Sequence, residues 1–135
     1  MKRSKYRNVE PSESQSQSAV IDWWRLACKG YGLPEFALFS IPNGAHKSMA
    51  ARMKFKREGL RAGVPDLFLA VPHVLNCDDG STAYIPGLWL EMKRKGGRVS
   101  PEQTAFLLYA RKQGYHAHIC YSADETIAAI KGYLA

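Results

Sequence analysis

The order of apolar and polar positions divides the chain into helical and extended segments. Residues 1–11 are polar and basic without periodicity, so we expect a flexible tail there. Ser12 and Gln15 have the spacing of a capping box, and apolar residues recur at helical intervals behind them. This pattern predicts a first helix. A second, strongly basic helix is expected over residues 46–58, with Gly59 as its C-terminal cap.

Short apolar runs predict four strands. They cover residues 36–41, 67–71, 88–93 and 115–121. The second run is too apolar to have a wet face, so we expect it in the middle of a sheet. Residues 72–87 are expected to form a long connection that turns at Asp78-Asp79-Gly80.

Two further helices are predicted in the last third of the chain. Ser100 and Gln103 again have capping-box spacing, and the apolar pattern behind them stops at Gly114. Ser122 and Glu125 open a last helix in the same way. The element order is therefore α-β-α-β-β-α-β-α, which belongs to the α/β class and predicts a mixed β-sheet flanked by helices.

Charge changes this picture more than composition does. The 135 residues carry a formal net charge of +7, and we expect one domain over residues 12–135. Residues 1–10 contribute +3, residues 45–63 contribute +5 and residues 91–98 contribute +3. Such segregation favours a polyanionic partner, nucleic acid first and an acidic membrane surface second, although a merely solubilising surface is the alternative.

The cysteines and the apolar runs bear on location. The three cysteines lie far apart and form no CxxC pair, so they indicate neither a zinc site nor a disulfide framework. No apolar run has the length of a membrane span or the form of a signal peptide. We therefore expect a cytoplasmic protein.

The candidate chemistry lies in GLWLEMKRKGGRVSPEQ, residues 87–103. Alternation along a strand places Glu91 and Lys93 on one face, about 7 Å apart. If the strand that begins after Asp66 pairs with this one as a hairpin, Asp66 faces Glu91. Two adjacent carboxylates repel unless a cation lies between them, and hard oxygen ligands suit Mg²⁺ or Mn²⁺. With a lysine to position or deprotonate water, this pattern is typical of a phosphodiester hydrolysis site.

Several of these segments carry a resemblance to a known family. GVPDLFLAVP, GLWLEMKRKGGRVSPEQ and GYHAHICYSADETIAAIKGYL resemble the VRR-NUC branch of the PD-(D/E)XK nuclease superfamily, and the upstream SIPNGAHK and KREGLRAGVPD do as well. The resemblance spans roughly residues 13–134 and is to small stand-alone members encoded by phages and prophages. It implies a restriction-endonuclease-like core, the cytoplasm of a bacterial host, and a metal-dependent nuclease that prefers branched DNA. The small dimeric members resemble Holliday-junction resolvases.

The resemblance also implies roles for individual residues. The family's metal-binding acid falls on Asp66, and its E-x-K motif falls on Glu91 and Lys93, with Met92 lending its backbone carbonyl to the ion. A glutamine early in the following helix corresponds to Gln103. The family further shows an acid or amide on the first helix, for which Glu13, Gln15 and Gln17 are candidates. We prefer Glu13 as an acid that binds the metal or supports its ligands from behind, and Gln17 as the residue that faces the site.

Each assignment has a plainer alternative. Asp66 could be a turn residue after Pro65, Glu91 and Lys93 a strand-end ion pair, and Gln103 only a capping residue. Basic helices are usually just solvated, yet a phosphate contact is plausible at several positions. The candidate DNA-binding residues are Asn43, His46, Lys47, Arg52, Lys56, Arg94, Lys95 and Arg98.

The sequence thus predicts a Mg²⁺- or Mn²⁺-dependent DNA endonuclease that selects Holliday junctions or other branched DNA. Because a branched substrate offers two equivalent strands, we expect a homodimer. A less selective nuclease that cuts flaps or single strands is an alternative. A DNA-binding module without catalytic activity is another.

Overall fold

The computed structural model describes residues 10–42 and 48–135. Most of the expected tail and the candidate DNA contacts Asn43, His46 and Lys47 lie outside the described residues. The long helices are α1 (Glu13–Ala27), α2 (Met49–Arg57), α3 (Pro101–Lys112) and α4 (Ala123–Leu134). Short 3₁₀ turns, η1 (Cys28–Tyr31) and η2 (Glu35–Ala37), follow α1. Within the described ranges, no helix is long and apolar enough to cross a bilayer.

A mixed sheet of four strands forms the centre of the molecule. Its strands are β1 (Leu38–Ser40), β2 (Leu67–Leu69), β5 (Leu88–Met92) and β6 (His116–Cys120), in the order β1-β2-β5-β6. β2 runs antiparallel to both of its neighbours, whereas β5 and β6 are parallel. The mixed α/β architecture and the interior position of β2 were both predicted from the sequence.

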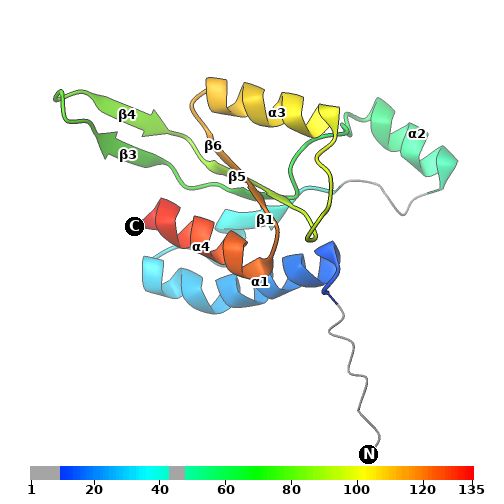
Figure 1. Ribbon diagram of the computed structural model, residues 1–135, viewed down its shortest axis with the longest axis horizontal. Coiled ribbons are helices and arrows are strands. Elements are labelled where there is room, and N and C mark those ends of the chain that lie inside the picture. The colour runs from blue at the N-terminus through cyan, green and yellow to red at the C-terminus, as the bar shows by residue number, and fades with distance from the viewer. Residues whose placement is uncertain (1–9, 43–47) are drawn as a thin grey trace, which may run out of the picture.

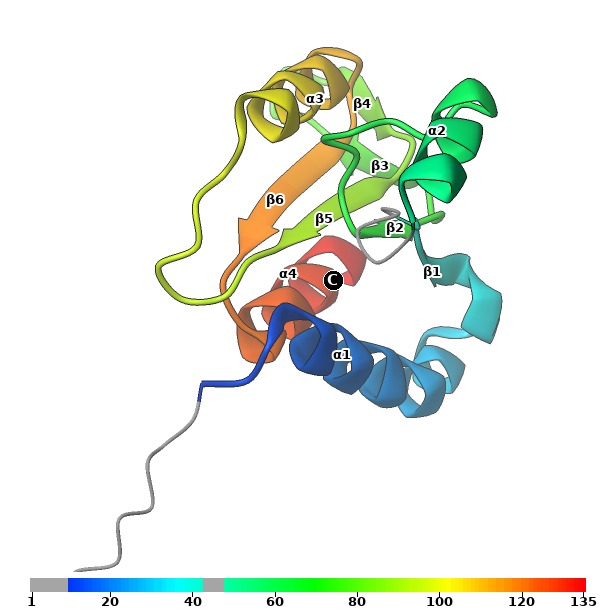
Figure 2. The same ribbon diagram turned by 90° about the vertical axis from the view of Figure 1, so that its right-hand side faces the viewer.

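The helices cover the two faces of the sheet unequally. α1 and α4 lie along one face, while α3 and, further out, α2 lie on the other (Figures 1 and 2). The main core is on the α1–α4 side, and its members include Trp24, Leu67, Leu69, Leu88 and Ile130. A smaller cluster around Leu107 fills the space beneath α3. α2 buries no residue, so its basic side chains stay in solvent.

The predicted helix caps form with one change. Ser12 with Gln15 and Ser100 with Gln103 make complete capping boxes, in which each side chain bonds the backbone of the other residue. At α4, Ser122 accepts from the Glu125 N–H as expected. The Glu125 carboxylate, however, accepts from the N–H of Tyr121 instead of completing the box. The ends of the helices are therefore largely encoded in local sequence.

The prediction that residues 72–87 form a long connection without strands is wrong. These residues form a hairpin of β3 (His73–Asn76) and β4 (Thr82–Ile85), which pair antiparallel in a separate two-stranded sheet. The predicted turn is present, and the Asp79 carboxylate accepts from the Ser81 N–H. Most residues of both strands are exposed, so no apolar alternation marked them as strands. The strand expected at residues 36–41 also begins later, because η2 precedes it.

Candidate active site

Asp66 lies where β2 begins, next to β5. The register pairs Leu67 with Leu90 and Phe68 with Trp89, so the next pair along the two strands is Asp66 and Glu91. The Asp66 carboxylate accepts a hydrogen bond from the backbone N–H of Met92 at 2.8 Å. The antiparallel pairing inferred from the sequence is therefore present, although a second hairpin separates the two strands in the chain. Asp66 is more than a turn residue, because its side chain contacts the strand that carries the other candidate groups.

Glu91 is a buried carboxylate with one satisfied and one unsatisfied oxygen. Its exposed fraction is only 3%. Oε1 accepts from the Gln103 side-chain amide at 2.9 Å and lies 3.5 Å from the Lys93 ammonium. Oε2 is buried and has no hydrogen-bond partner among the described residues. A buried carboxylate oxygen without a donor is unfavourable, which makes this atom a natural ligand for a cation.

The electrostatics of the two acids point the same way. Burial and then the charge of Asp66 raise the pKa of Glu91 to about 7, although the Lys93 charge opposes the shift. Burial also raises the pKa of Asp66, against the hydrogen bond from Met92, and the charge of Glu13 adds to the rise. The charge of Asp66 thus makes Glu91 harder to ionise, and a divalent cation between the two carboxylates would relieve that cost.

Gln103 makes both of the contacts that the sequence left as alternatives. Its Oε1 accepts from the Ser100 N–H at 2.9 Å and completes the capping box of α3. Its Nε2 donates to Glu91. The two ends of one amide therefore connect the start of α3 to the buried carboxylate.

The candidates on α1 separate by position. Glu13 is the first residue of the helix, and its carboxylate accepts from the Arg94 N–H at 3.4 Å, directly after the E-x-K segment. The charge of Glu13 reaches both Asp66 and Glu91. Gln15 is occupied by the helix cap. Gln17 is half-buried one turn further on, and its side chain makes no hydrogen bond to the acids or to Lys93 in the part of the chain that the structure describes.

The residues present fit a hard divalent cation. Residues 10–42 and 48–135 hold no cluster of three or more His, Cys, Asp or Glu side chains that could serve as a ready-made metal site. Two carboxylates, one with an unpartnered buried oxygen, nevertheless face each other here. The N–H and C=O of a strand residue point toward the same neighbouring strand, so the Met92 carbonyl lies on the β2 side of β5, as its N–H does. Such an all-oxygen set suits Mg²⁺ or Mn²⁺, which keep several waters.

The described basic candidates fall into two groups. Arg94, Lys95 and Arg98 are exposed in the turn that follows β5, close in sequence to Lys93. Arg52 and Lys56 are exposed on α2, and neither has an ion-pair partner among the described residues. Unpaired surface cations of this kind are free to contact phosphates.

One contact at the site was missed from the sequence. Gly63 has a positive φ of 91° and lies against the first turn of α3, where a Cβ would come within 2.6 Å of the Glu102 carbonyl carbon and oxygen. This glycine stands three residues before Asp66 in the segment GVPD. Only the glycine itself could have signalled a close backbone approach.

Comparison with known proteins agrees with the resemblance described above. The VRR-NUC domain matches residues 3–124 of this chain. A solved structure described as a VRR_NUC domain protein superimposes with a TM-score of 0.73 at 25% sequence identity, covering 94% of this chain and 93% of that chain. No curated protein matches.

Proposed function

The chain belongs to the VRR-NUC family, whose domain is that of a nuclease, and from this premise we propose that it is a metal-dependent endonuclease of DNA. We assign its sheet to the restriction-endonuclease-like PD-(D/E)XK core, with Asp66 as the first acid and Glu91 and Lys93 as the E-x-K pair. The observation that carries the proposal is the buried, unpartnered Oε2 of Glu91 beside Asp66 and Lys93.

Asp66, Glu91 and the Met92 carbonyl would hold Mg²⁺ or Mn²⁺, and Glu13 adds negative charge on the same side. When bound, such an ion supplies a Lewis acid at the scissile phosphate and lowers the pKa of its bound water. Burial of Glu91 keeps this charge in a medium of low dielectric, where each ionic interaction is stronger than in water.

The remaining groups position the reactants. The Lys93 ammonium holds or deprotonates the attacking water and offsets charge that develops on the phosphate. Gln103 fixes the orientation of Glu91, and its own orientation is fixed by the cap of α3. Arg94, Lys95 and Arg98 in the adjacent turn and Arg52 and Lys56 on α2 contact the DNA backbone. We propose that Gln17, which is half-buried on α1, faces the site from that helix.

We propose that the substrate is branched DNA and that the protein acts as a homodimer. A Holliday junction or another branched DNA presents two equivalent strands, so a twofold dimer would place one site at each. The exposed basic residues of α2 and those of the turn after β5 lie on separate elements. This separation favours a substrate in which more than one DNA strand contacts the protein.

A cleavage panel tests this proposal. Duplex, flap, fork and four-way junction DNA are incubated with Mg²⁺ or Mn²⁺, and we expect metal-dependent cleavage that is fastest on a branched form. Asp66→Asn should abolish cleavage, whereas the matched control Asp79→Asn, in the exposed hairpin turn, should not. If neither metal supports cleavage of any of these DNA forms, the chain is a DNA-binding module and the proposal fails.

A further inference from the structure

Three aromatic side chains lie in one row across the sheet. The register places Phe39 of β1 opposite Phe68 of β2, and Phe68 opposite Trp89 of β5. Neighbouring rings are in contact, with centroids 5.8 Å apart for the first pair and 4.3 Å for the second. Residues directly opposite each other share a face, so the aromatic row projects from a single side of the sheet.

That side is the one that carries the candidate active site. Asp66 precedes Phe68 by two residues and Glu91 follows Trp89 by two, and the strands are antiparallel. Both acids are therefore displaced from the aromatic row in the same direction, by about 7 Å. The aromatic row and the carboxylates form successive rows on one surface.

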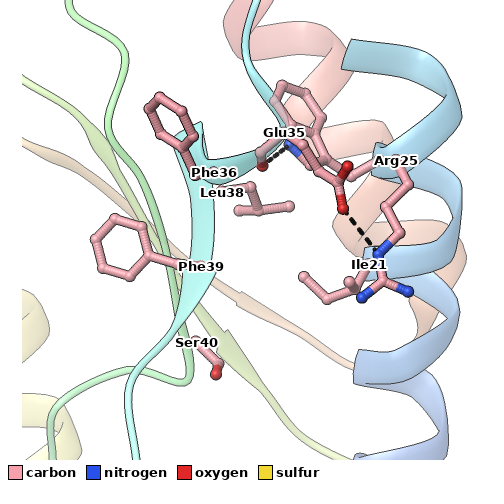
Figure 3. A pocket seen from close by; sticks show the side chains of 8 residues that line it. Ile21, Arg25, Glu35, Phe36, Leu38, Phe39 and Ser40 are labelled. Carbon is pink, nitrogen blue, oxygen red and sulfur yellow. Dashed lines mark hydrogen bonds and ion pairs between the residues drawn. The ribbon is translucent and has the colours of Figure 1, made fainter.

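The β1 end of the aromatic row is open to solvent. The main core and helices α1 and α4 lie against the opposite face, where Leu38, Leu67 and Leu69 are buried. Figure 3 shows Leu38 pointing toward α1 and Phe39 pointing away from it. Phe39 remains 41% exposed on the far side, and α2, the helix that follows β1, buries no residue. Phe39 therefore offers an apolar ring to solvent on the face that carries the two carboxylates.

The other end of the aromatic row is held firmly. A Cβ on Gly87 would overlap the Phe68 ring, so the absence of a side chain there makes room for that ring. Trp89 packs edge-on against Phe106 of α3 at 5.1 Å. The ring faces at the β1 end are thus presented by a supported surface, as a binding surface requires.

We infer that Phe39, the exposed end of the aromatic row, stacks with an unpaired base of the nucleic acid strand whose phosphate lies at the carboxylates. In a duplex the faces of the bases are covered by their neighbours, so an aromatic ring stacks at least cost on a base that is already unpaired or splayed. The exposed basic residues of the turn after β5 and of α2 supply complementary charge for the backbone of that strand. This inference rests on the proposed nuclease function and specifies its substrate as DNA with unpaired bases beside the cut.

The test measures binding in EDTA, so that it does not depend on cleavage. Anisotropy gives the affinity of the wild-type protein for a labelled single strand, the same strand with abasic sites, and a duplex. We expect abasic substitution to weaken binding of the single strand on the order of tenfold. Wild-type protein that binds both single strands equally well overturns the inference, and this comparison needs no variant.

Variants identify the ring responsible. Phe39→Ala should lose about tenfold in affinity for the normal single strand, keep its affinity for duplex, and no longer distinguish abasic strands. Phe39→Tyr, which keeps the ring, should bind as wild type, and so should the control Tyr84→Ala, an exposed aromatic on the β3–β4 hairpin. A Phe39→Ala protein that still discriminates abasic strands contradicts the inference. The inference is also contradicted if the Phe39→Ala substitution converts a dimer into a monomer and leaves the single-strand affinity unchanged. The aromatic row would then be an interface between two copies of the chain.

Discussion

At the scale of single residues, Gln103 connects the start of a helix to a buried carboxylate of the candidate site. A capping glutamine needs only its carbonyl oxygen, which leaves the amide N–H₂ free for a second partner. Here that partner is Glu91, at 2.9 Å. The alternatives of cap and site residue that the sequence left open are therefore not exclusive.

Substitution of Gln103 separates these two contacts. Gln103→Ala should lower the free energy of unfolding by about 1 kcal/mol and weaken Mn²⁺ binding about 10- to 100-fold, because Glu91 loses its orienting donor. Ser100→Ala removes the hydroxyl cap but leaves the amide on Glu91, so it should cost similar stability with unchanged Mn²⁺ affinity. Denaturant unfolding and calorimetric titration measure both quantities. Equal Mn²⁺ affinity in the two variants would contradict the role of Gln103.

The raised pKa of Glu91 makes the stability of the metal-free protein depend on pH. Because folding raises this pKa from 4.5 to about 7, folding favours the protonated acid. Protonated Glu91 therefore contributes its full share to the free energy of unfolding below pH 4.5. That share is lost as the pH rises through 7. Glu91→Gln is neutral throughout, so its free energy of unfolding relative to wild type should increase over that range, by up to about 3 kcal/mol.

Denaturant titrations in EDTA at pH 4.5 and pH 8 measure this difference. Glu10→Gln, in the exposed segment before α1, is the control. A Glu91→Gln variant whose stability relative to wild type is the same at both pH values would show that burial does not penalise the charge of Glu91.

Much of the candidate site follows from strand alternation. It placed Glu91 and Lys93 on one face, and a pairing argument placed Asp66 opposite Glu91. The hydrogen bond from Met92 to Asp66 could not be foreseen, because it depends on where one rotamer lies relative to a strand 26 residues away. The unpartnered oxygen of Glu91 likewise depends on the packing of the whole site.

At the scale of elements, the segment before β2 is fitted closely to α3. Gly63 contacts the backbone of Glu102 in α3. The next residue of that helix, Gln103, donates to Glu91, so the contact at Gly63 sets the distance between the Asp66 segment and α3. A side chain at residue 63 would have to move backbone atoms.

A pair of glycine substitutions isolates that contact. Gly59 also has a positive φ, but a Cβ there meets nothing within 4 Å. Gly59→Ala should therefore cost about 1 kcal/mol of backbone strain. Gly63→Ala should cost at least about 2 kcal/mol more, because overpacking adds to the strain. If denaturant unfolding gives equal losses in the free energy of unfolding for the two variants, α3 shifts without cost to accommodate a side chain at residue 63.

Elements with a buried face or a capped end were predicted well, and the β3–β4 hairpin was not. The cap residues Ser100, Pro101 and Gln103 predict the start of α3, and a continuous apolar run predicts β2. The hairpin strands are four residues each and mostly exposed, and of their eight residues only Ile85 is buried in the main core. With so little burial, no clear alternation of apolar residues distinguishes such strands from a loop.

At the scale of the whole molecule, the basic charge is segregated and should govern DNA binding. If Arg52 and Lys56 contact phosphates, the double alanine variant should reduce the slope of log affinity against log salt by about 2, with little change between DNA sequences. Lys29 and Lys131, exposed on the α1–α4 side, provide the matched double control. An unchanged slope in the α2 variant would exclude this helix from the DNA interface.

The central claim is that Asp66, Glu91 and Lys93 form a hydrolytic site for DNA, and Lys93 tests it most directly. Single-turnover cleavage of a four-way junction in Mn²⁺ is compared for the wild type, Lys93→Ala and the control Lys29→Ala, with junction affinity measured alongside. Lys93→Ala should lose at least about 100-fold in cleavage rate while its affinity stays within about twofold, and Lys29→Ala should match the wild type. Cleavage by Lys93→Ala at the wild-type rate would contradict the account.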